Sequence, residues 1–355
     1  MFRSRRAPQL AATLTSALLL VTATACGGDD SGSDDTGAGA QADASGSSAF
    51  PVTVAHKYGS TTIESEPRRI VTVGLTDQDA VLALGEVPVG TTEWLGGYKG
   101  AVGPWAADRL GGAEAPTVLT DTGTGPQVEK IAALRPDLIL AVYGGLTEEQ
   151  YASLSKFAPV VAQPKQYNDY GVPWQEQTET IGKALGKPEE AAAAVEETEG
   201  RITAAVEEHP EFRGRTAVMA TPYEGMFVFG SQDPRSHLLT DLGFSLPPDL
   251  DKEIGDQFGA NISKERTDLL DQDAVVWQVA DVTEDAAKLH EDPSYKDLKV
   301  VAEGREVYVN ETSDYGNALS MGTVLSLRYV VDRLVPQLAA AVDGKAGTTV
   351  EQPAS

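Results

Sequence analysis

The fold is decided by two similar stretches, QVEKIAALRPDLILAV at 127–142 and SKERTDLLDQDAVVWQV at 263–279. In each stretch a Glu (Glu129, Glu265) opens a short helical segment, and an Asp (Asp137, Asp273) follows eight residues later. The apolar residues after each Asp have the length of a buried parallel strand. Because the two units recur in the two halves of the chain, they predict two similarly built α/β lobes.

Outside these units, stretches with strand and helix patterns alternate, which predicts a mainly parallel sheet flanked by helices in each lobe. The stretch 188–209 begins with Pro188, is rich in Ala and Glu, and is stopped by Pro210. We interpret it as one long helix that connects an N-terminal lobe, 51–187, to a C-terminal lobe, 210–343. The expected fold is therefore α/β, with the two lobes joined by a single long helix and a ligand cleft between them.

The N-terminus has the pattern of a secretory signal. Arg3, Arg5 and Arg6 are the only charged residues before position 26, and a short apolar stretch with a small-residue exit follows them. The exit resembles a bacterial lipobox, so we expect residues 1–25 to be a lipoprotein signal peptide and Cys26 to carry the lipid. Since Cys26 is the only cysteine, the chain can form no intrachain disulfide and no cysteine-based metal site.

The body of the chain is strongly acidic. The full sequence carries a net charge of −25, and removing the three Arg of residues 1–25, which contain no acid, leaves −28. Such a body will not bind nucleic acid through its phosphates, and we expect membrane contact through the lipid anchor only. Residues 26–50 are mostly Gly, Ser, Asp, Thr and Ala and predict a disordered tether, and 344–355 predict a disordered tail.

Several motifs together point to a known family. They are PRRIVTVG at 67–74, GPQVEKIAALRPDLIL at 125–140, the long helix, and KERTDLLDQDAVVW at 264–277. In this order and spacing the chain resembles bacterial solute-binding lipoproteins that deliver ferric siderophores, haem or cobalamin to ABC importers. The resemblance implies a binding protein that works as a monomer, without a cofactor. It also implies that Glu129 and Glu265 pair with Arg residues of the permease, although helix N-termini favour such acids anyway.

Candidate ligand-binding residues follow predicted strands, where open α/β sheets bind ligands. One group lies in the loop that follows a short strand expected at 87–89, and another follows strands of the second lobe. Aromatic rings suit a large, partly apolar chelate, and an Arg suits its oxygen-rich iron centre, although any one aromatic could instead pack in the core. The candidates are Trp94, Tyr98, Trp105, Tyr143, Tyr223, Phe227, Arg235, Trp277 and Tyr315.

The same loops narrow the choice of ligand. The four His are scattered through the sequence, which disfavours a bare metal ion, and no metal site is expected. Few basic residues lie on the candidate loops, which favours a ferric hydroxamate over a catecholate. Haem, with Tyr98 or Tyr223 as axial ligand, and cobalamin remain alternatives.

Two other classes of protein are alternatives to a solute-binding protein. The sequence contains no nucleophile elbow, P-loop or dinucleotide fingerprint, so we expect a binding protein rather than an extracellular enzyme. A surface adhesion module is the remaining alternative, and it would bind no small molecule tightly.

Overall fold

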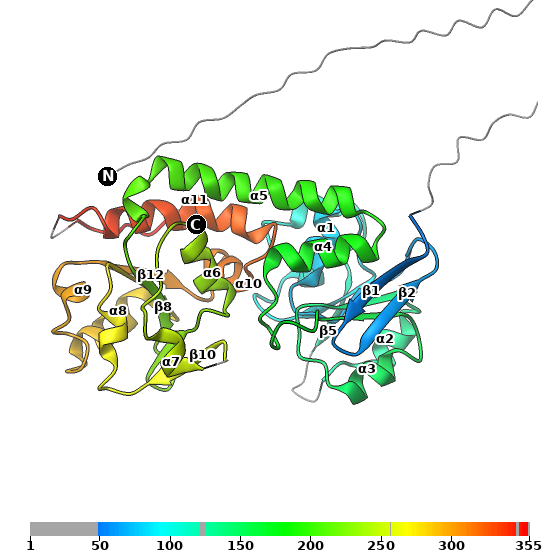
Figure 1. Ribbon diagram of the computed structural model, residues 1–355, viewed down its shortest axis with the longest axis horizontal. Helices are drawn as coiled ribbons and strands as arrows, with labels where there is room; N and C mark the ends of the chain where they lie inside the picture. The colour runs from blue at the N-terminus through cyan, green and yellow to red at the C-terminus, as the bar shows by residue number, and fades with distance from the viewer. Residues whose placement is uncertain (1–48, 121–124, 256, 346–347, 354–355) are drawn as a thin grey trace, which may run out of the picture. The chain divides into compact units, whose positions relative to one another are not determined.

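Two five-stranded sheets form the framework of the computed structural model (Figure 1). The structure describes residues 49–120, 125–255, 257–345 and 348–353, and these described residues form one compact unit. The predicted signal peptide, Cys26 and the tether up to residue 48 lie outside the described residues. None of the described helices is long and apolar enough to cross a membrane.

The first sheet is parallel throughout, in the order β5-β4-β3-β6-β7. Its strands are β3 (Ile70–Thr72), β4 (Gly90–Glu93), β5 (Thr117–Thr120), β6 (Leu138–Ala141) and β7 (Val160–Ala162). An antiparallel hairpin precedes it, formed by β1 (Val52–His56) and β2 (Gly59–Ile63). The helices of this lobe are α1 (Asp77–Ala83), α2 (Val128–Ala133), α3 (Glu148–Leu154) and α4 (Trp174–Ala184), with 3-10 turns at Lys99–Ala101 and Ala107–Leu110.

The strand expected at 87–89 lies instead at β4. Gly90 begins β4, and a Cβ atom there would stand 2.4 Å from Cδ1 of Leu134, so a larger residue would require that side chain to move. The apolar residues before it therefore mark the approach to the strand and not the strand itself. Trp94 directly follows β4, at the carboxyl edge of the sheet.

The second sheet is mixed, in the order β10-β9-β8-β11-β12. β8, β11 and β12 are parallel to one another, whereas β8–β9 and β9–β10 are antiparallel pairs. Only residues 222–225 separate β8 from β9, which is too short for a parallel crossover. The strands are β8 (Ala217–Thr221), β9 (Met226–Phe229), β10 (Gly259–Ile262), β11 (Ala274–Val279) and β12 (Glu306–Asn310).

The helices around the second sheet are short, except for the last one, α11. They are α6 (Pro234–Asp241), α7 (Leu250–Ile254), α8 (Val282–Glu291), α9 (Lys299–Ala302), α10 (Asp314–Met321) and α11 (Ser326–Ala341), with 3-10 turns at Pro210–Phe212 and Thr267–Leu270.

The repeated Asp holds the central strand pair of each sheet. The Asp137 carboxylate accepts hydrogen bonds from the backbone N–H groups of Arg68 and Arg69, at 2.9 and 2.8 Å, directly before β3. In the second lobe the Asp273 carboxylate accepts one from the N–H of Thr216, at 2.8 Å, directly before β8. Each Asp thus fixes the register of two parallel neighbours, β3 with β6 and β8 with β11.

The two Glu of the repeat differ in local structure. Glu129 lies in the first turn of α2, as expected, whereas Glu265 lies in a turn ahead of the 3-10 segment Thr267–Leu270 and opens no α-helix. Both side chains are exposed.

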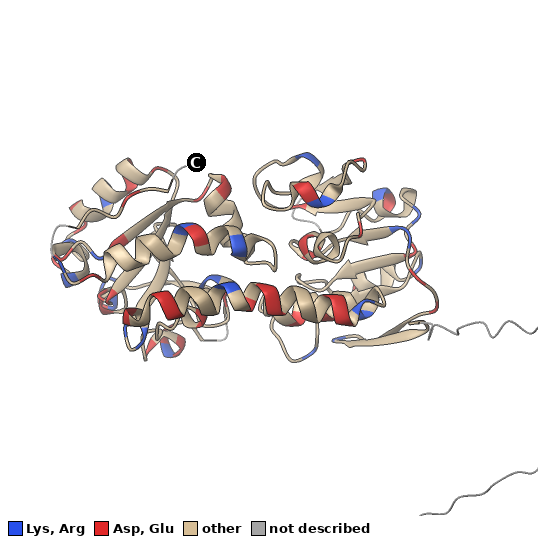
Figure 2. Cartoon of the chain, turned by 90° about the horizontal axis from the view of Figure 1, so that it is seen from above, with Lys and Arg blue, Asp and Glu red and all other residues tan. Residues whose placement is uncertain are grey.

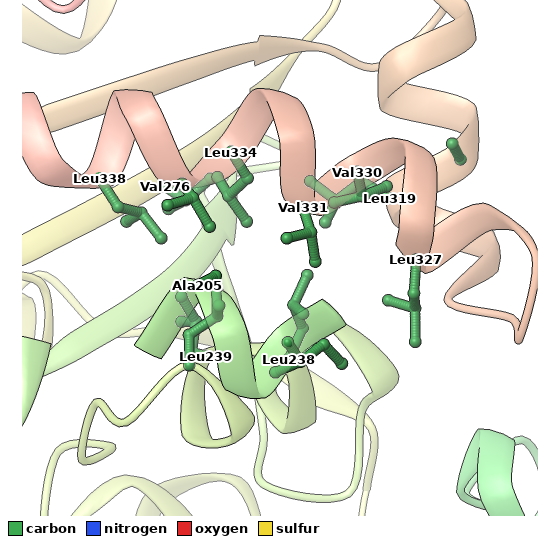
Figure 3. Packing of buried hydrophobic residues seen from close by; sticks show 14 of the residues in the cluster. Ala205, Leu238, Leu239, Val276, Leu319, Leu327, Val330, Val331, Leu334 and Leu338 are labelled. Carbon is green, nitrogen blue, oxygen red and sulfur yellow. The ribbon is translucent and has the colours of Figure 1, made fainter. Parts of the chain in front are cut away.

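The long helix α5 (Pro188–Glu208) lies where a connecting helix is predicted, and it packs against both lobes. One stripe of it is buried against α4 and α11, while most of its remaining positions are Glu or other exposed residues (Figures 1 and 2). The stripe consists of Ala191, Val195, Thr198, Ile202 and Ala205. Figure 3 shows Ala205 in one cluster with the apolar side chains of α6, β11 and α11.

Polar contacts fix α5 to the C-terminal helix as well. Thr198 Oγ1 donates to the carbonyl of Val324 at 2.9 Å and accepts from Arg328 Nε at 2.8 Å. Farther along, Gln337 Nε2 donates to the carbonyl of Glu351 at 3.1 Å, and Val350 packs on the core. Residues 348–353 therefore lie against the C-terminal lobe, which composition alone did not predict.

We expect Asp273→Ala to lower the free energy of unfolding by about 2 kcal/mol, the typical loss when hydrogen bonds to a charged acceptor are removed. Burial by itself would raise the pKa of Asp273, but the bonds from Thr216 and the nearby Arg215 outweigh it and lower the pKa. Urea unfolding at neutral pH measures the effect. Asp297→Ala, which removes an exposed carboxylate in the same lobe, is the control; equal effects of the two substitutions would contradict the role of Asp273.

Candidate ligand-binding site

Two adjoining pockets lie between the lobes. The main pocket has a volume of about 650 Å³ and the side pocket one of about 280 Å³. Trp94, which follows β4, and Arg235, in the first turn of α6, line both of them, so the pockets form one cleft. The main pocket is also lined by Leu95, Gly96, Thr221, Tyr223, Phe229, Gln278, Glu311, Thr312, Asn317 and Ser320, and the side pocket by Leu75, Tyr143, Tyr170, Asp233 and Phe258.

Arg235 is held rigidly at the junction of the two pockets. Its Nε and Nη2 each donate at 2.7 Å to the two oxygens of Asp233, the N-cap residue of α6. Nη1 donates to Gln278 Oε1 at 3.0 Å, and the guanidinium lies 3.6 Å from the centre of the Phe229 ring. Burial would lower the pKa of Arg235, but Asp233 outweighs it and raises the pKa, so the side chain stays charged.

Aromatic rings form the walls of the cleft. Trp94 and Tyr143 lie with ring centres 6.4 Å apart, and Tyr170 meets Tyr143 edge-on at 6.0 Å. Tyr223 and Phe258 belong to the second lobe and are 63% and 46% exposed, so a ligand in the cleft could cover both rings. The cleft therefore combines aromatic surface with a single fixed cation.

A buried carboxylate positions Tyr143. Asp77 accepts hydrogen bonds from the backbone N–H groups of Val142 and Tyr143, at 2.8 and 2.9 Å, and from Gln177 Nε2 at 2.8 Å. Burial raises the pKa of Asp77, against the effect of these hydrogen bonds. Gly74 is required beside it, since a Cβ there would stand 2.2 Å from Asp77 Oδ2.

Tyr98 and Trp105, both predicted to bind ligand, lie on the contact between the lobes. Tyr98 donates its hydroxyl hydrogen to Asp314 Oδ1 at 2.8 Å and accepts from Asn317 Nδ2 at 3.0 Å. Burial, and then the hydrogen bond to Asp314, raise the pKa of Tyr98 to about 12. Trp105 meets the Tyr329 ring of α11 at 6.2 Å. Neither residue lines the main or the side pocket, because these contacts occupy their side chains.

Asp79 of α1 lies at the centre of this contact. Its Oδ2 accepts from Trp105 Nε1 at 2.8 Å and from the hydroxyl of Thr323, which belongs to the second lobe. Its Oδ1 is buried without a hydrogen-bond partner among the described residues. Burial raises the pKa of Asp79 from 3.8 to about 6, although the two hydrogen bonds act in the opposite direction.

Three further residues that the sequence predicted to bind ligand line neither pocket. Trp277 is fully buried on the face of β11 that packs against α8 and α9, and its Nε1 donates to Tyr295 at 2.8 Å. Tyr315 is buried against α11 and donates to Gln337 at 2.9 Å. Phe227 lies within β9 rather than after a strand, and it packs on Phe229 and Phe258.

The sequence did not predict that residues close to these candidates line the cleft instead. Side chains alternate along a strand, so Gln278 faces the cleft where Trp277 cannot. On α10 the positions Asn317 and Ser320 lie one turn apart and share a face, which Tyr315 does not. The missed lining residues include Tyr170, Asp233, Phe258, Gln278, Glu311, Asn317 and Ser320. Only Asp233-Pro234, an N-cap followed by a first-turn Pro, carried a readable signal.

No histidine lines either pocket, and the described hydrogen bonds of histidine rings lie elsewhere, with Tyr58, Thr61, Glu211, Glu306 and Tyr308 as partners. Within the described part of the chain, no group of three or more His, Cys, Asp or Glu could hold a metal ion.

A cleft between two α/β lobes bridged by one helix defines a solute-binding protein. A family model described as periplasmic binding protein matches residues 70–311, more than half of the chain. The chain belongs to this family, whose members bind substrates and are not enzymes. The expected fold, with two lobes of sheet flanked by helices, is confirmed.

Individual relatives agree with this assignment. The chain is 28% identical to the Fe(3+) dicitrate-binding periplasmic protein FecB of Escherichia coli K12. The alignment covers 57% of this chain and 64% of FecB. It thus spans less than two thirds of this curated relative. A periplasmic solute binding protein from Mycobacterium smegmatis is 34% identical with a TM-score of 0.70, covering 82% of this chain and 98% of that one. PiaA of Streptococcus pneumoniae TIGR4 in complex with ferrichrome is 28% identical with a TM-score of 0.73, covering 83% and 99%.

We expect Asp79→Asn to flatten the dependence of stability on pH between about 4 and 6. A carboxyl group whose pKa is raised on folding stabilises the fold in its protonated form, so its contribution is complete below 3.8 and is lost as the pH rises through about 6. A rise of this size corresponds to about 3 kcal/mol.

Urea unfolding of wild type and variant across this pH range gives the comparison. The stability of the variant relative to wild type should increase from pH 4 to pH 7.5. The exposed Asp108→Asn serves as control and should keep the wild-type slope. Parallel pH profiles for Asp79→Asn and wild type would contradict the burial of a titrating group between the lobes.

Proposed function

We propose that this protein captures a ferric siderophore of the hydroxamate class outside the cytoplasm and delivers it to an ABC importer. The observation that carries the proposal is the cleft itself, with aromatic walls at Trp94, Tyr143 and Tyr223 and one rigid cation, Arg235. Ring faces suit the apolar backbone of such a chelate, and Arg235 suits its oxygen-rich centre. A similar structure, PiaA, is described in complex with ferrichrome.

The scarcity of cations supports a hydroxamate over a catecholate. Arg235 is the only Lys or Arg among the described residues that line the two pockets. A strongly anionic catecholate centre would need several cations to offset its desolvation. Haem and cobalamin are alternative cargoes for the same fold, with Tyr223 as the one predicted axial ligand that faces the main pocket.

Anchoring and docking complete the proposed transport function. Lipid attachment at Cys26 would hold the protein at the outer face of the cell membrane. Exposed Glu129 and Glu265, one in each lobe, would pair with Arg residues of the permease, because Arg recognises carboxylates with two parallel hydrogen bonds. We propose that the protein works as a monomer.

We expect ferrichrome or ferric ferrioxamine B to quench the tryptophan fluorescence of residues 27–355 saturably, since Trp94 lines both pockets. Tyr223→Ala should weaken binding roughly tenfold, which corresponds to about 1.4 kcal/mol for a lost aromatic contact. Phe157→Ala removes another exposed ring, 47% accessible and outside both pockets, and should bind like wild type.

A panel with haem, cobalamin, ferric citrate and free ferric ion separates the alternatives. Saturation by haem or cobalamin alone would change the cargo and keep the fold, whereas no saturable response to any compound would overturn the proposed binding function.

We expect Glu129→Ala and Glu265→Ala to reduce uptake of the ferric chelate by cells that carry the protein and its importer, with the double variant lowest. Binding of the chelate to the purified variants should be unchanged, because both carboxylates lie outside the two pockets. Glu148→Ala, on an exposed turn of α3, is the control. Normal uptake by the double variant would exclude the two Glu as docking residues.

A further inference from the structure

The cleft arginine has its charge compensated by a buried aspartate. Asp233 is 2% exposed and contributes both carboxylate oxygens to Arg235, at 2.7 Å each. These two contacts and the one to Gln278 use three of the five N–H groups of Arg235, so two remain to donate to a ligand. Arg235 can therefore donate hydrogen bonds into the cleft without making it positive.

Beside the pair of Arg235 and Asp233, the described lining of the cleft contains one more charged residue, the acid Glu311. Of the described residues that line the two pockets, Arg235 is the one cation, and Asp233 and Glu311 are the anions. The formal charge of the lining is therefore slightly negative. The surrounding protein adds to this potential, since the whole chain carries −25.

Such a lining favours ligands according to their charge. An anionic complex that enters the cleft loses its hydration and meets Asp233 at short range, without an unpaired cation to offset either cost. A neutral or cationic complex meets neither penalty and still receives hydrogen bonds from Arg235. Glu311 is exposed, so water and salt screen it far more than they screen Asp233.

We propose that Asp233 determines the charge class of the ligand, so that the cleft accepts neutral and cationic ferric complexes and rejects anionic ones such as ferric citrate. The inference rests on the proposed function and narrows it. It therefore predicts a different ligand for this chain than ferric dicitrate, the ligand in the name of its relative FecB.

A purely structural role of Asp233 makes a different prediction. Asp233 also caps α6 by accepting from the N–H of Arg235 at 2.9 Å. Asn caps helices about as well as Asp and has nearly the same shape, so Asp233→Asn removes the charge and keeps the cap. A lost cap would weaken all ligands alike, whereas a lost charge changes their order.

The test is a fluorescence titration of wild type and Asp233→Asn with four complexes. Ferrichrome is neutral, ferric ferrioxamine B is cationic, and ferric citrate and ferric enterobactin are anionic. Wild type should bind the first two at least roughly tenfold more tightly than the last two. In Asp233→Asn the ratio of anionic to neutral affinity should rise by roughly tenfold or more. In the control Asp297→Asn, which removes an exposed carboxylate outside both pockets, it should change by less than about threefold.

The outcomes separate the two proposals. Equal affinity of wild type for neutral and anionic chelates, or equal loss of all four ligands in Asp233→Asn, would overturn the charge selection while leaving the siderophore function intact. Binding of none of the ferric complexes by wild type would overturn both. If the thermal unfolding curve shows that Asp233→Asn does not fold, Asp233→Ser, which also removes the charge and keeps a capping oxygen, takes its place in the same titration.

Discussion

The carboxylates of Asp137 and Asp273 bind the backbone in front of a neighbouring strand, and the arrangement of both sheets depends on this contact. Each one fixes a central parallel pair, β3 with β6 and β8 with β11, in a register that a hydrophobic strand alone does not specify. Because parallel strands end at the same edge, the loops after them converge. The lining residues Trp94, Tyr143 and Gln278 come from such strand ends, so the repeated Asp indirectly places the cleft.

The contact between the lobes combines apolar packing with a few buried polar groups. One apolar cluster contains Leu82 and Trp174 of the first lobe together with residues of α6, β11 and α11, and α5 lies across both lobes (Figures 1 and 3). Asp79 and Tyr98 add hydrogen bonds to the second lobe. The aromatic residues nearest the cleft thus divide into two roles, since some hold the lobes together and others line the space between them.

Much of the architecture could be predicted because it is encoded locally. The apolar runs after Asp137 and Asp273, and the Pro-flanked helix at α5, carry signals that tertiary contacts do not override. β10 and α10 carry no clear pattern, because their sequences are short and rich in polar residues or Gly, so only packing makes them regular. The antiparallel pairing of β8 and β9 could not be predicted, since a strand pattern does not reveal the direction of its partner.

The sequence by itself determined the two α/β units, the long helix and the acidic character, because periodicity and composition act within short windows. It also marked Trp94, Tyr143 and Tyr223, which follow strands, and Arg235, which lies in the first turn of α6. Only the tertiary structure decided that Trp277 faces the core and Gln278 the cleft, and that Tyr98 and Trp105 join the lobes. It also decided that Asp233 neutralises Arg235. Which way a side chain points depends on surfaces supplied by residues far away in the chain, and no local pattern contains them.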